Sequence, residues 1–402
     1  MQKGSQMEIT DRSKCCGCSA CYSICPVKCI NMVIDPEGFL YPAVDEEKCI
    51  NCGLCKKVCP INHAFEKTSG LAVYAAISKE SKVLSNCASG GVFFHLARQT
   101  LNENGVVFGA RYNEDFSIVH DFTENIDAIP QYMGSKYVQS KIGENYKIAK
   151  EFLDSGRKVL FTGVPCQILG LRNYLQKDYD NLIAVNLICH SCPSPKVFKV
   201  FIEDICKKAT LPLIRHITMR YKQYNLQGQP ESNYMALFDQ LPKLDTKVEP
   251  VYKKVFYETS FGKGFGTGLF ARPSCFACPA KNLTSGSDIT IGDFWGIEKF
   301  YPNLNSKSGV SVVITQTNNG ARYFEAIKSQ FMVYNSTFEQ VIEKNPRLIT
   351  PLVADNNLRE KFWQDFINNP TSLTIKTHTK PTLKSKIRNL ISFALRKLKL
   401  RK

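Results

Sequence analysis

Two runs of cysteines near the start of the chain restrict its fold more than any other feature. Both runs have the spacing C-x2-C-x2-C-x3-C-P, 34 residues apart: Cys15, Cys18, Cys21, Cys25 and Pro26, then Cys49, Cys52, Cys55, Cys59 and Pro60. Such self-similarity marks a duplicated supersecondary unit. Ten of the 17 cysteines precede residue 60, and the first 14 residues lack the apolar stretch of a signal peptide. In a reducing compartment this clustering indicates metal ligation and not a disulfide framework.

The spacing of both runs is that of two-cluster bacterial ferredoxins. Three cysteines of a tight loop bind one 4Fe–4S cube, and the fourth cysteine of each run completes the other cube. We therefore predict one cluster on Cys15, Cys18, Cys21 and Cys59, and a second on Cys49, Cys52, Cys55 and Cys25. Gly17 and Gly53 would let the loop backbone approach the sulfides. Structural zinc sites use four ligands in C-x2-C pairs, which these runs do not match. Cys16 and Cys29 lie outside the register and are not expected to be ligands.

The length of 402 residues predicts two or three domains, and a hydrophobic content of 44% is enough for conventional buried cores. We assign residues 8–62 to the two-cluster domain and 61–70 to a linker. No run of 18 or more apolar residues exists, which argues against a membrane-spanning helix. We therefore expect a cytoplasmic protein.

From residue 71 onward, strand-like and helix-like segments alternate. We expect strands at 71–78, 106–112, 117–121, 158–162, 182–189, 288–293 and 310–316, and helices at 92–101, 146–153, from 165 and at 195–208. Apolar strands alternating with helices favour an α/β sheet covered on its faces. The stretch 212–270 is strand-rich and polar and is predicted to form an arm. Asn319-Gly320 indicates a turn before a helix, and 331–375 a helical extension.

The predicted fold class is α+β, with an N-terminal bacterial dicluster ferredoxin-like domain followed by an α/β domain with a mixed sheet. The second domain covers 71–330, with an N-terminal part at 71–150 and a C-terminal part at 151–330.

Several phrases in the α/β part are too particular to be explained by packing alone. In chain order they are Ser89-Gly90-Gly91, GSKYVQS at 134–140, FTGVPCQ at 161–167, Cys189-His190, Cys275-x2-Cys278 and DITIGDFWG at 288–296. Together they resemble the beta subunit family of coenzyme F420 hydrogenases and dehydrogenases over residues 71–330. In that family an N-terminal dicluster ferredoxin domain is a common companion. The resemblance implies that the α/β domain binds FAD and exchanges electrons between iron–sulfur clusters and a small molecule.

Ser89-Gly90-Gly91 stands where a helix is expected to begin, so its backbone N–H groups would be open to a flavin pyrophosphate. Lys136 on a loop would add a cation, and we include Gly163 among the expected cofactor-binding residues. From the Ser-Gly-Gly residues alone, a plain helix cap is an equal alternative. Gly264-x-Gly266-x-Gly268 lacks a preceding βαβ pattern, so we interpret it as a flexible loop and not as a dinucleotide fingerprint.

The resemblance also implies a third 4Fe–4S cluster near the flavin, with four further ligands: Cys166, Cys189, Cys275 and Cys278. The alternatives are that the first two are small buried hydrophobes and that the C-x2-C pair binds zinc or nothing. Cys192 follows in the phrase Cys-His-Ser-Cys, where relatives usually have glycine and an apolar residue, and it leaves the fourth ligand ambiguous. We expect Cys87 and Cys206 to bind no metal.

His190 is a candidate proton donor to reduced flavin or to substrate, although a lone histidine beside a strand end is more often structural. Flavin hydride chemistry resides in the cofactor, so we assign no catalytic residue from the sequence.

The formal charge of +16 is concentrated at the end of the chain. No acidic residue follows Asp365, and residues 376–402 carry ten Lys or Arg among apolar residues at helical spacing. This pattern predicts a basic amphipathic tail, which would place the protein at the inner, anionic face of the membrane. A disordered tail or a partner-binding helix is an equal alternative. No recognition motif for nucleic acid accompanies the charge.

We therefore expect an iron–sulfur flavoprotein oxidoreductase. Its 4Fe–4S clusters would relay single electrons, FAD would pool two, and a pair would pass to or from a small soluble redox substrate, F420-like or other. The alternative is an electron-transfer subunit without its own substrate that docks to a partner oxidoreductase. A redox-sensing interaction protein is a third hypothesis. The sequence does not identify the substrate.

Overall fold

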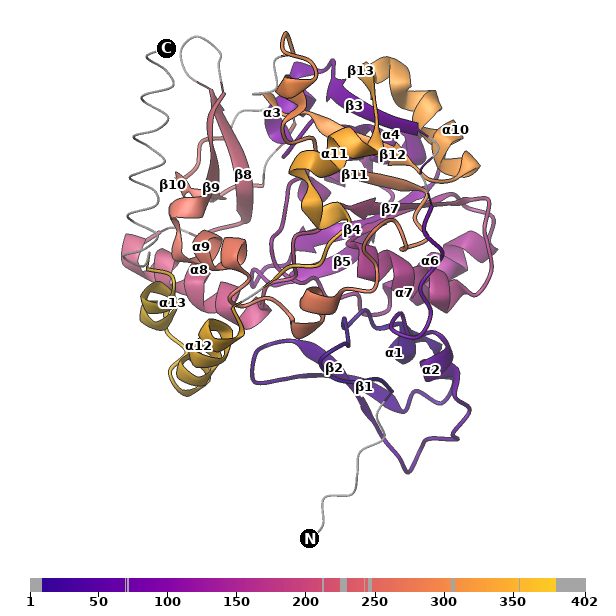
Figure 1. Cartoon of the computed structure of the whole chain (residues 1–402), viewed down its shortest axis with the longest axis vertical. Coiled ribbons are helices and arrows are strands. Elements are labelled where there is room, and N and C mark those ends of the chain that lie inside the picture. Colours follow the sequence, from indigo (N-terminus) through magenta and orange to yellow (C-terminus); the bar gives the residue numbers. More distant parts are fainter. Residues whose placement is uncertain are drawn as a thin grey trace.

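The computed structural model describes residues 9–380, apart from 69, 71, 212, 225–229, 242, 245–247, 305–307 and 354. A body built on one large sheet makes up most of the molecule, and the cysteine-rich domain lies at one end of it (Figure 1). A smaller three-stranded sheet stands beside the body. The predicted basic tail, from residue 381 onward, falls outside the described residues.

The cysteine-rich domain consists of a hairpin and two short helices. Its elements are α1 (Ala20–Ile24), β1 (Ile30–Ile34), β2 (Leu40–Val44) and α2 (Leu54–Lys57), with β1 and β2 antiparallel. A residue in the left-handed conformation precedes each helix, Ser19 at φ 67° and Gly53 at φ 72°. These residues turn the backbone sharply, so each cysteine run folds as a tight loop followed by a short helix.

The central sheet of the body has eight strands in the order β13-β3-β12-β11-β7-β6-β4-β5. Their bounds are β3 (Ala72–Ser78), β4 (Val106–Tyr112), β5 (Ile118–Thr123), β6 (Val159–Gly163), β7 (Leu182–Leu187), β11 (Ile289–Asp293), β12 (Ser311–Thr315) and β13 (Phe331–Ser336). The inner strands β11, β7, β6 and β4 run parallel, and the outer pairs are antiparallel. The sheet is therefore mixed, as predicted for an α+β chain.

Helices cover both faces of this sheet, because successive strand residues point to opposite sides. Val107 and Leu160 pack with α4 (Val92–Asn102) and α10 (Asn318–Ile327) on one face. Phe108 and Phe161 stack at 5.3 Å on the other face, under α6 (Asn145–Asp154) and α7 (Pro165–Leu175). Three shorter helices complete the body: α3 (Ser81–Asn86), α5 (Ile129–Tyr132) and α11 (Phe338–Lys344).

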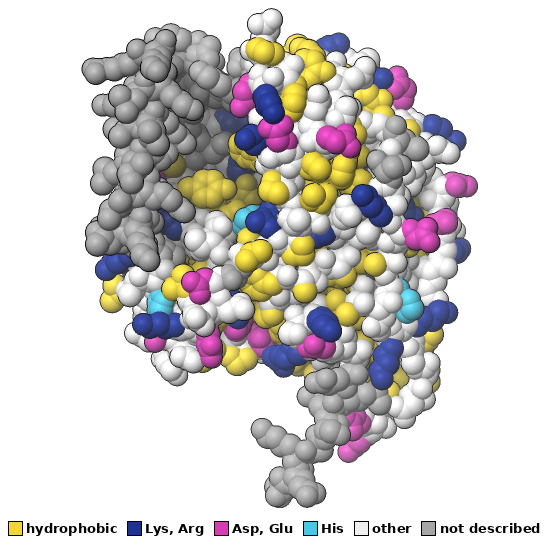
Figure 2. Space-filling model, viewed as in Figure 1, with side chains coloured by type: hydrophobic (Ala, Val, Ile, Leu, Met, Phe, Trp, Pro, Cys, Tyr) yellow, Lys and Arg dark blue, Asp and Glu magenta, His cyan; other side chains and the backbone are white. Residues whose placement is uncertain are grey.

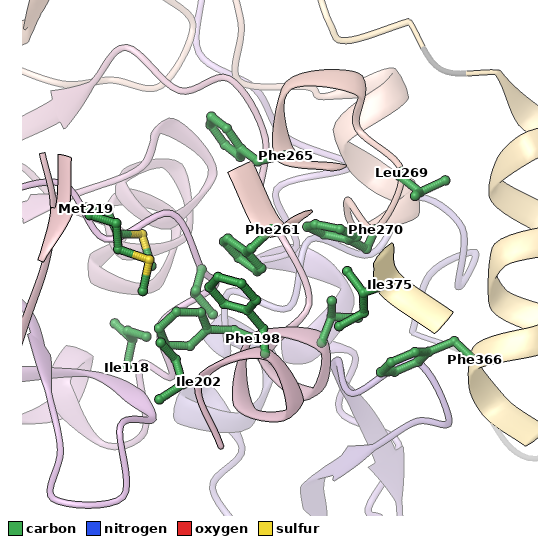
Figure 3. Close-up of a cluster of buried hydrophobic side chains, with 14 of the residues drawn as sticks. Ile118, Phe198, Ile202, Met219, Phe261, Phe265, Leu269, Phe270, Phe366 and Ile375 are labelled. Atoms are coloured by element: carbon green, nitrogen blue, oxygen red, sulfur yellow. The ribbon is translucent and has the colours of Figure 1, made fainter. Parts of the chain in front are cut away.

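The three-stranded sheet is antiparallel in the order β10-β9-β8 and packs with four helices. The elements are β8 (His216–Tyr224), β9 (Pro230–Phe238), β10 (Tyr252–Val255), α8 (Pro195–Ala209), α9 (Ser260–Thr267), α12 (Asn356–Asn368) and α13 (Ser372–His378). In Figure 3, Phe198 of α8, Phe261 of α9 and Phe270 point into one cluster, with the Phe261 and Phe270 rings stacked at 5.1 Å. Met219 of β8 belongs to this core, so the arm is less polar than expected.

The cysteine-rich domain is anchored to the body through two of these cores. Phe39 and Tyr41 join the core under α8, and Cys18 and Ala20 join the core under α7. In Figure 1, α1 and α2 accordingly lie directly below α7. The first cysteine run is thus the one that faces the body.

Two of our expectations for the C-terminal third are wrong. Phe331–Ser336 is a strand and not a helix, because its β-forming residues pair with the free edge of β3. Asn319 and Gly320 lie inside α10, since Thr317 Oγ1 caps this helix by accepting the N–H of Gly320 at 3.0 Å.

The glycine-rich phrase at 264–268 is also not a flexible loop. It forms the second half of α9 and its C-cap, Gly268 at φ 73°. A Cβ on Gly264 would lie 2.1 Å from the ring of Phe270, so the glycine lets the aromatic ring pack on the helix. Close packing overrides the low helix propensity of glycine.

Figure 2 shows one face of the described surface, on which basic and acidic side chains are interspersed among hydrophobic ones. This face of the described part of the chain presents no extended area of a single charge.

Candidate functional site

The eight predicted cluster ligands line two hollows of the cysteine-rich domain. One, the inner hollow, is lined by three cysteines of the first run and one of the second: Cys15, Cys18, Cys21 and Cys59. The other, the outer hollow, measures about 120 Å³ and is lined by the complementary set: Cys49, Cys52, Cys55 and Cys25. Each hollow combines three cysteines of one run with the fourth of the other, as the two-cluster arrangement requires.

The two hollows differ in burial. Cys15 and Cys18 of the inner hollow are 8% and 6% exposed, whereas Cys52 of the outer hollow is exposed. A Cβ on Gly170 of α7 would lie 2.9 Å from Cys18 Sγ, so this glycine allows the inner hollow to approach the body closely. The outer hollow has the exposed Ile50 in its wall and opens toward solvent.

A second group of cysteines, the body thiols, gathers near the ends of β6 and β7. It consists of Cys166 in the first turn of α7, Cys189 and Cys192 after β7, and Cys275 and Cys278 around the 3-10 turn Pro273–Ala277. Cys192 has hydrogen bonds to three of the other thiols, and its backbone N–H donates to Cys275 Sγ at 3.3 Å. The hydrogen bond with Cys192 lowers the pKa of Cys189 to about 7.

The structure thus brings together all four predicted ligands of a third cluster and adds Cys192 to them. A 4Fe–4S cube takes four thiolates, so five thiols leave the choice of the fourth ligand open. The phrase Cys-His-Ser-Cys was the signal in the sequence for this ambiguity.

Cys16 connects the inner hollow with the body thiols. Its buried side chain is hydrogen-bonded to Cys166 and Cys18, which lowers the pKa of the Cys16 thiol. The amide of Gln139 donates to the carbonyl of Cys16 at 2.9 Å. Sequence reasoning set Cys16 aside as outside the ligand register and did not anticipate this bridging position.

Three cysteines outside these groups have other surroundings. Cys29 lies 3.4 Å from Cys25, sulfur to sulfur, behind the outer hollow. Cys87 donates to the carbonyl of Ser89 at 2.7 Å, and Cys206 lies on α8. Among the described residues, no three His, Cys, Asp or Glu side chains are gathered as a single metal ion would need. A cube, whose irons each take one thiolate, requires a wider spacing.

A cavity of about 260 Å³ lies next to the body thiols, at the carboxyl ends of β6, β7 and β11. Ligands of open α/β sheets bind at such strand ends. Four of the five predicted cofactor-binding residues line the cavity: Ser89, Gly91, Lys136 and Gly163. Cys189 and Cys192 line it too, so the cavity and the thiol group share a wall.

The start of α4 forms one end of this cavity. Gly90 does not line it, because its N–H donates to Ser311 Oγ at 2.9 Å and its Cα packs on the carbonyl of Ala76. Gly91, at φ 88°, is the N-cap, and Val92 and Phe93 of the first turn line the cavity. First-turn N–H groups have no acceptor within their own helix. The anion-binding groups of α4 are therefore those of Val92 and Phe93, while Gly90 serves packing.

Two basic side chains stand at the cavity wall. Lys136 Nζ donates to the carbonyl of Met133 at 2.9 Å, and burial lowers its pKa to about 7. His120, which no motif singled out, contacts Ser140 Oγ and the carbonyl of Thr162, both at 2.9 Å. Burial lowers the pKa of His120 to about 4.

His190 is a lining residue with an unsatisfied atom. Its Nε2 is buried without a hydrogen-bond partner, as is Ser191 Oγ, and its ring lies 4.9 Å from that of Phe265. Burial lowers the pKa of His190. Buried polar atoms without partners are rare in native proteins, so these two atoms indicate that a ligand completes the cavity.

Comparison with known proteins identifies two regions of the chain. Residues 156–340 match the model for the C terminus of the coenzyme F420 hydrogenase/dehydrogenase beta subunit, and residues 14–63 match that of the 4Fe-4S dicluster domain. A similar solved structure is the xenon-derivatised F420-reducing [NiFe] hydrogenase complex from Methanosarcina barkeri. The matched chain is 18% identical over 76% of this chain and 90% of that one, with a TM-score of 0.42. No curated protein matches. Within the described residues, no helix is long and apolar enough to cross a membrane.

Proposed function

Since the chain belongs to the coenzyme F420 hydrogenase/dehydrogenase beta subunit family and carries an N-terminal 4Fe–4S dicluster domain, its work is electron transfer of the oxidoreductase type. We propose that it is an iron–sulfur flavoenzyme, which passes electrons between 4Fe–4S clusters, FAD and a small soluble redox substrate.

The observation that carries this proposal is an unbroken series of thiols. It begins at the solvent-open outer hollow, continues through the buried inner hollow and Cys16, and reaches the body thiols, which border the cavity. Such a series is the arrangement expected of a wire that brings single electrons from the surface to a cofactor. When bound, each 4Fe–4S cluster carries one electron at a time.

The residues present fit the clusters. Each hollow offers four thiols on separate walls, and the body thiols offer a backbone N–H to Cys275 Sγ at 3.3 Å. N–H···S bonds of this kind tune cluster potentials. In this proposal the third cluster takes Cys166, Cys189 or Cys192, Cys275 and Cys278.

The cavity residues fit a flavin nucleotide. The N–H groups of Val92 and Phe93, at the positive end of α4, would hold the pyrophosphate, with Ser89 and Lys136 beside them. Gly163, at the end of β6, presents no side chain to the cofactor. The unpartnered Nε2 of His190 would hydrogen-bond the bound ligand and hold a proton near it. When bound, FAD takes up two electrons singly and gives them up as a pair.

Anaerobic purification tests the proposal. We expect stoichiometric FAD, bleached by dithionite, and about 12 irons per chain, eight of them from the dicluster domain. Cys275→Ser should then remove about four irons and leave the other eight. Absence of flavin from protein that holds its iron would contradict a flavoenzyme.

A second candidate function is an electron-transfer subunit without its own substrate, docked to a partner oxidoreductase. The observation that favours it is the apolar margin of the outer hollow, where Ile34 and Ile50 are 73% and 60% exposed. Isolated protein that contains clusters and flavin but reduces no small acceptor until a partner oxidoreductase is added would support this candidate.

A further inference from the structure

Arg272 is the largest fully buried side chain of the described residues and lies between the two thiol groups. Its backbone belongs to the body thiols, since its N–H donates to the carbonyl of Cys192 at 2.9 Å and its carbonyl accepts the N–H of Cys275 at 3.0 Å. Its side chain extends in the opposite direction, into the cysteine-rich domain. One residue therefore connects both groups.

The guanidinium is bound on all sides by the first cysteine run and its hairpin. Nε donates to the carbonyl of Cys15 at 2.6 Å, Nη2 to that of Leu40 at 2.9 Å, and Nη1 to Gln139 Oε1 at 3.0 Å. Nη2 also lies 3.7 Å from Cys15 Sγ. The Tyr41 ring, at 4.2 Å, covers its face.

No carboxylate balances this charge. Among the described residues Arg272 forms no ion pair with Asp or Glu, and the groups that face its charge are Cys15, Tyr41, Cys16 and Cys275. Burying a cation without a counter-ion is costly. A 4Fe–4S cube with four thiolates is a net anion, so a cluster in the inner hollow would supply the missing counter-charge.

We propose that Arg272 sets the reduction potential of the cluster in the inner hollow, an inference that rests on the proposed iron–sulfur function. Reduction adds a negative charge to the cube, and a cation 3.7 Å from one of its thiolates stabilises the reduced form more than the oxidised form. Arg272 thus raises the potential of this cluster and is a positioning residue for electron transfer.

Gly17 supports this arrangement. A Cβ on Gly17 would lie 2.7 Å from Arg272 Nη1, so the guanidinium occupies space that only a glycine at this position leaves free. The corresponding glycine of the second run, Gly53, has no atom within 4 Å of the same point. The outer hollow has no equivalent of the Arg272 contact among the described residues.

An EPR-monitored redox titration of the anaerobic holoprotein tests the proposal. In Arg272→Gln we expect one cluster potential to shift downward by at least 59 mV, a tenfold change in its reduced-to-oxidised ratio for one electron, while the others stay. Arg272→Lys, which keeps the charge, should restore most of the shift. Arg359→Gln is the matched control, because Arg359 is ion-paired with Glu37 in the same interface but contacts no cysteine.

The outcomes separate the two proposals. Wild-type protein without about eight irons would refute the iron–sulfur function itself. Loaded Arg272→Gln protein with unchanged potentials would overturn only the role of Arg272. If Arg272→Gln does not retain the cluster, Gln139→Leu replaces it, since this change frees Nη1 and keeps the charge. Its inner-cluster potential should fall by a smaller factor, and an unchanged potential would overturn the proposal.

Discussion

The first and second cysteine runs share one spacing, but the structure gives their hollows different surroundings. The inner hollow is closed by α7 and lies against Arg272, Cys16 and the body thiols. The outer hollow has an exposed cysteine and faces solvent with apolar residues around it. Spacing therefore determines which cysteines share a cube, whereas packing against the body determines what each cube can do.

The comparison suggests a division of labour. The outer position is suited to receive electrons from a donor protein, because only there is a predicted ligand open to solvent. The inner position is suited to pass electrons to the body, because only there does a thiol series continue. The predictions below break or sharpen this division.

Loss of one cluster should have the largest effect. Cys18→Ala and Cys52→Ala should each remove about four irons, but with different consequences. With dithionite as donor, Cys18→Ala should slow flavin reduction at least about tenfold, because the connection to the body is cut. Cys52→Ala should slow it little, since dithionite reaches the inner cluster directly. Stopped-flow bleaching measures both rates, and Cys206→Ala, on α8, is the control. Equal slowing by both variants would refute the division.

Removal of iron by a chelator should be biphasic. The exposed outer cluster should release its irons first, and the buried inner cluster should follow several times more slowly, because it opens only when the interface with α7 opens. The loss of charge-transfer absorbance over time measures both phases. Cys52→Ala should lack the fast phase. A single phase for all irons would show that the two positions do not differ in access.

The close approach of the inner hollow to α7 should be visible in stability. In Gly170→Ala the new Cβ would meet Cys18 Sγ at 2.9 Å and the Tyr146 hydroxyl at 3.0 Å, so we expect a loss of about 1–3 kcal/mol. Gly266→Ala is the matched control, because its Cβ in α9 would meet no atom closer than 3.9 Å. It should raise stability by about 0.5–1 kcal/mol. Anaerobic urea denaturation compares the two, and equal effects would mean that the contact is not tight.

The sequence was informative where chemistry imposes a spacing and less so where packing decides. The cysteine runs led to the ligand sets that now line two hollows, because a cube tolerates few alternatives. The apolar segments led to the strands of the mixed sheet, since buried parallel strands leave a continuous signal. The strand Phe331–Ser336 was missed, because its pairing with β3 depends on a neighbour more than 250 residues away in the chain.

The missed site residues share a physical reason. Arg272 and His120 act through contacts that join distant segments, Cys15 with the C-x2-C region and β5 with β6. No local pattern marks such contacts. Gly90 shows the opposite error, since a phrase suited to a phosphate also suits close packing, and the structure spends its N–H on Ser311. Glycine motifs report a close approach but not which group approaches.

The smallest effect concerns protons, and it extends the contrast between exposed and buried positions to the cavity. Burial lowers the pKa of Lys136 to about 7, so its ammonium loses its charge as pH rises through 7. The pyrophosphate of FAD favours the charged form, and flavin affinity should therefore fall a few-fold between pH 6 and about pH 8. His120 and His216 face the same ammonium, but burial lowers their pKa to about 4 and about 3, so both stay neutral in this range. Fluorescence of released FAD measures the affinity, and Lys136→Met should bind more weakly at pH 6 and show no slope. A slope that survives in Lys136→Met would place the titrating cation elsewhere, with Lys222, bonded to the carbonyl of Ser89 at 2.9 Å, as the next residue to replace.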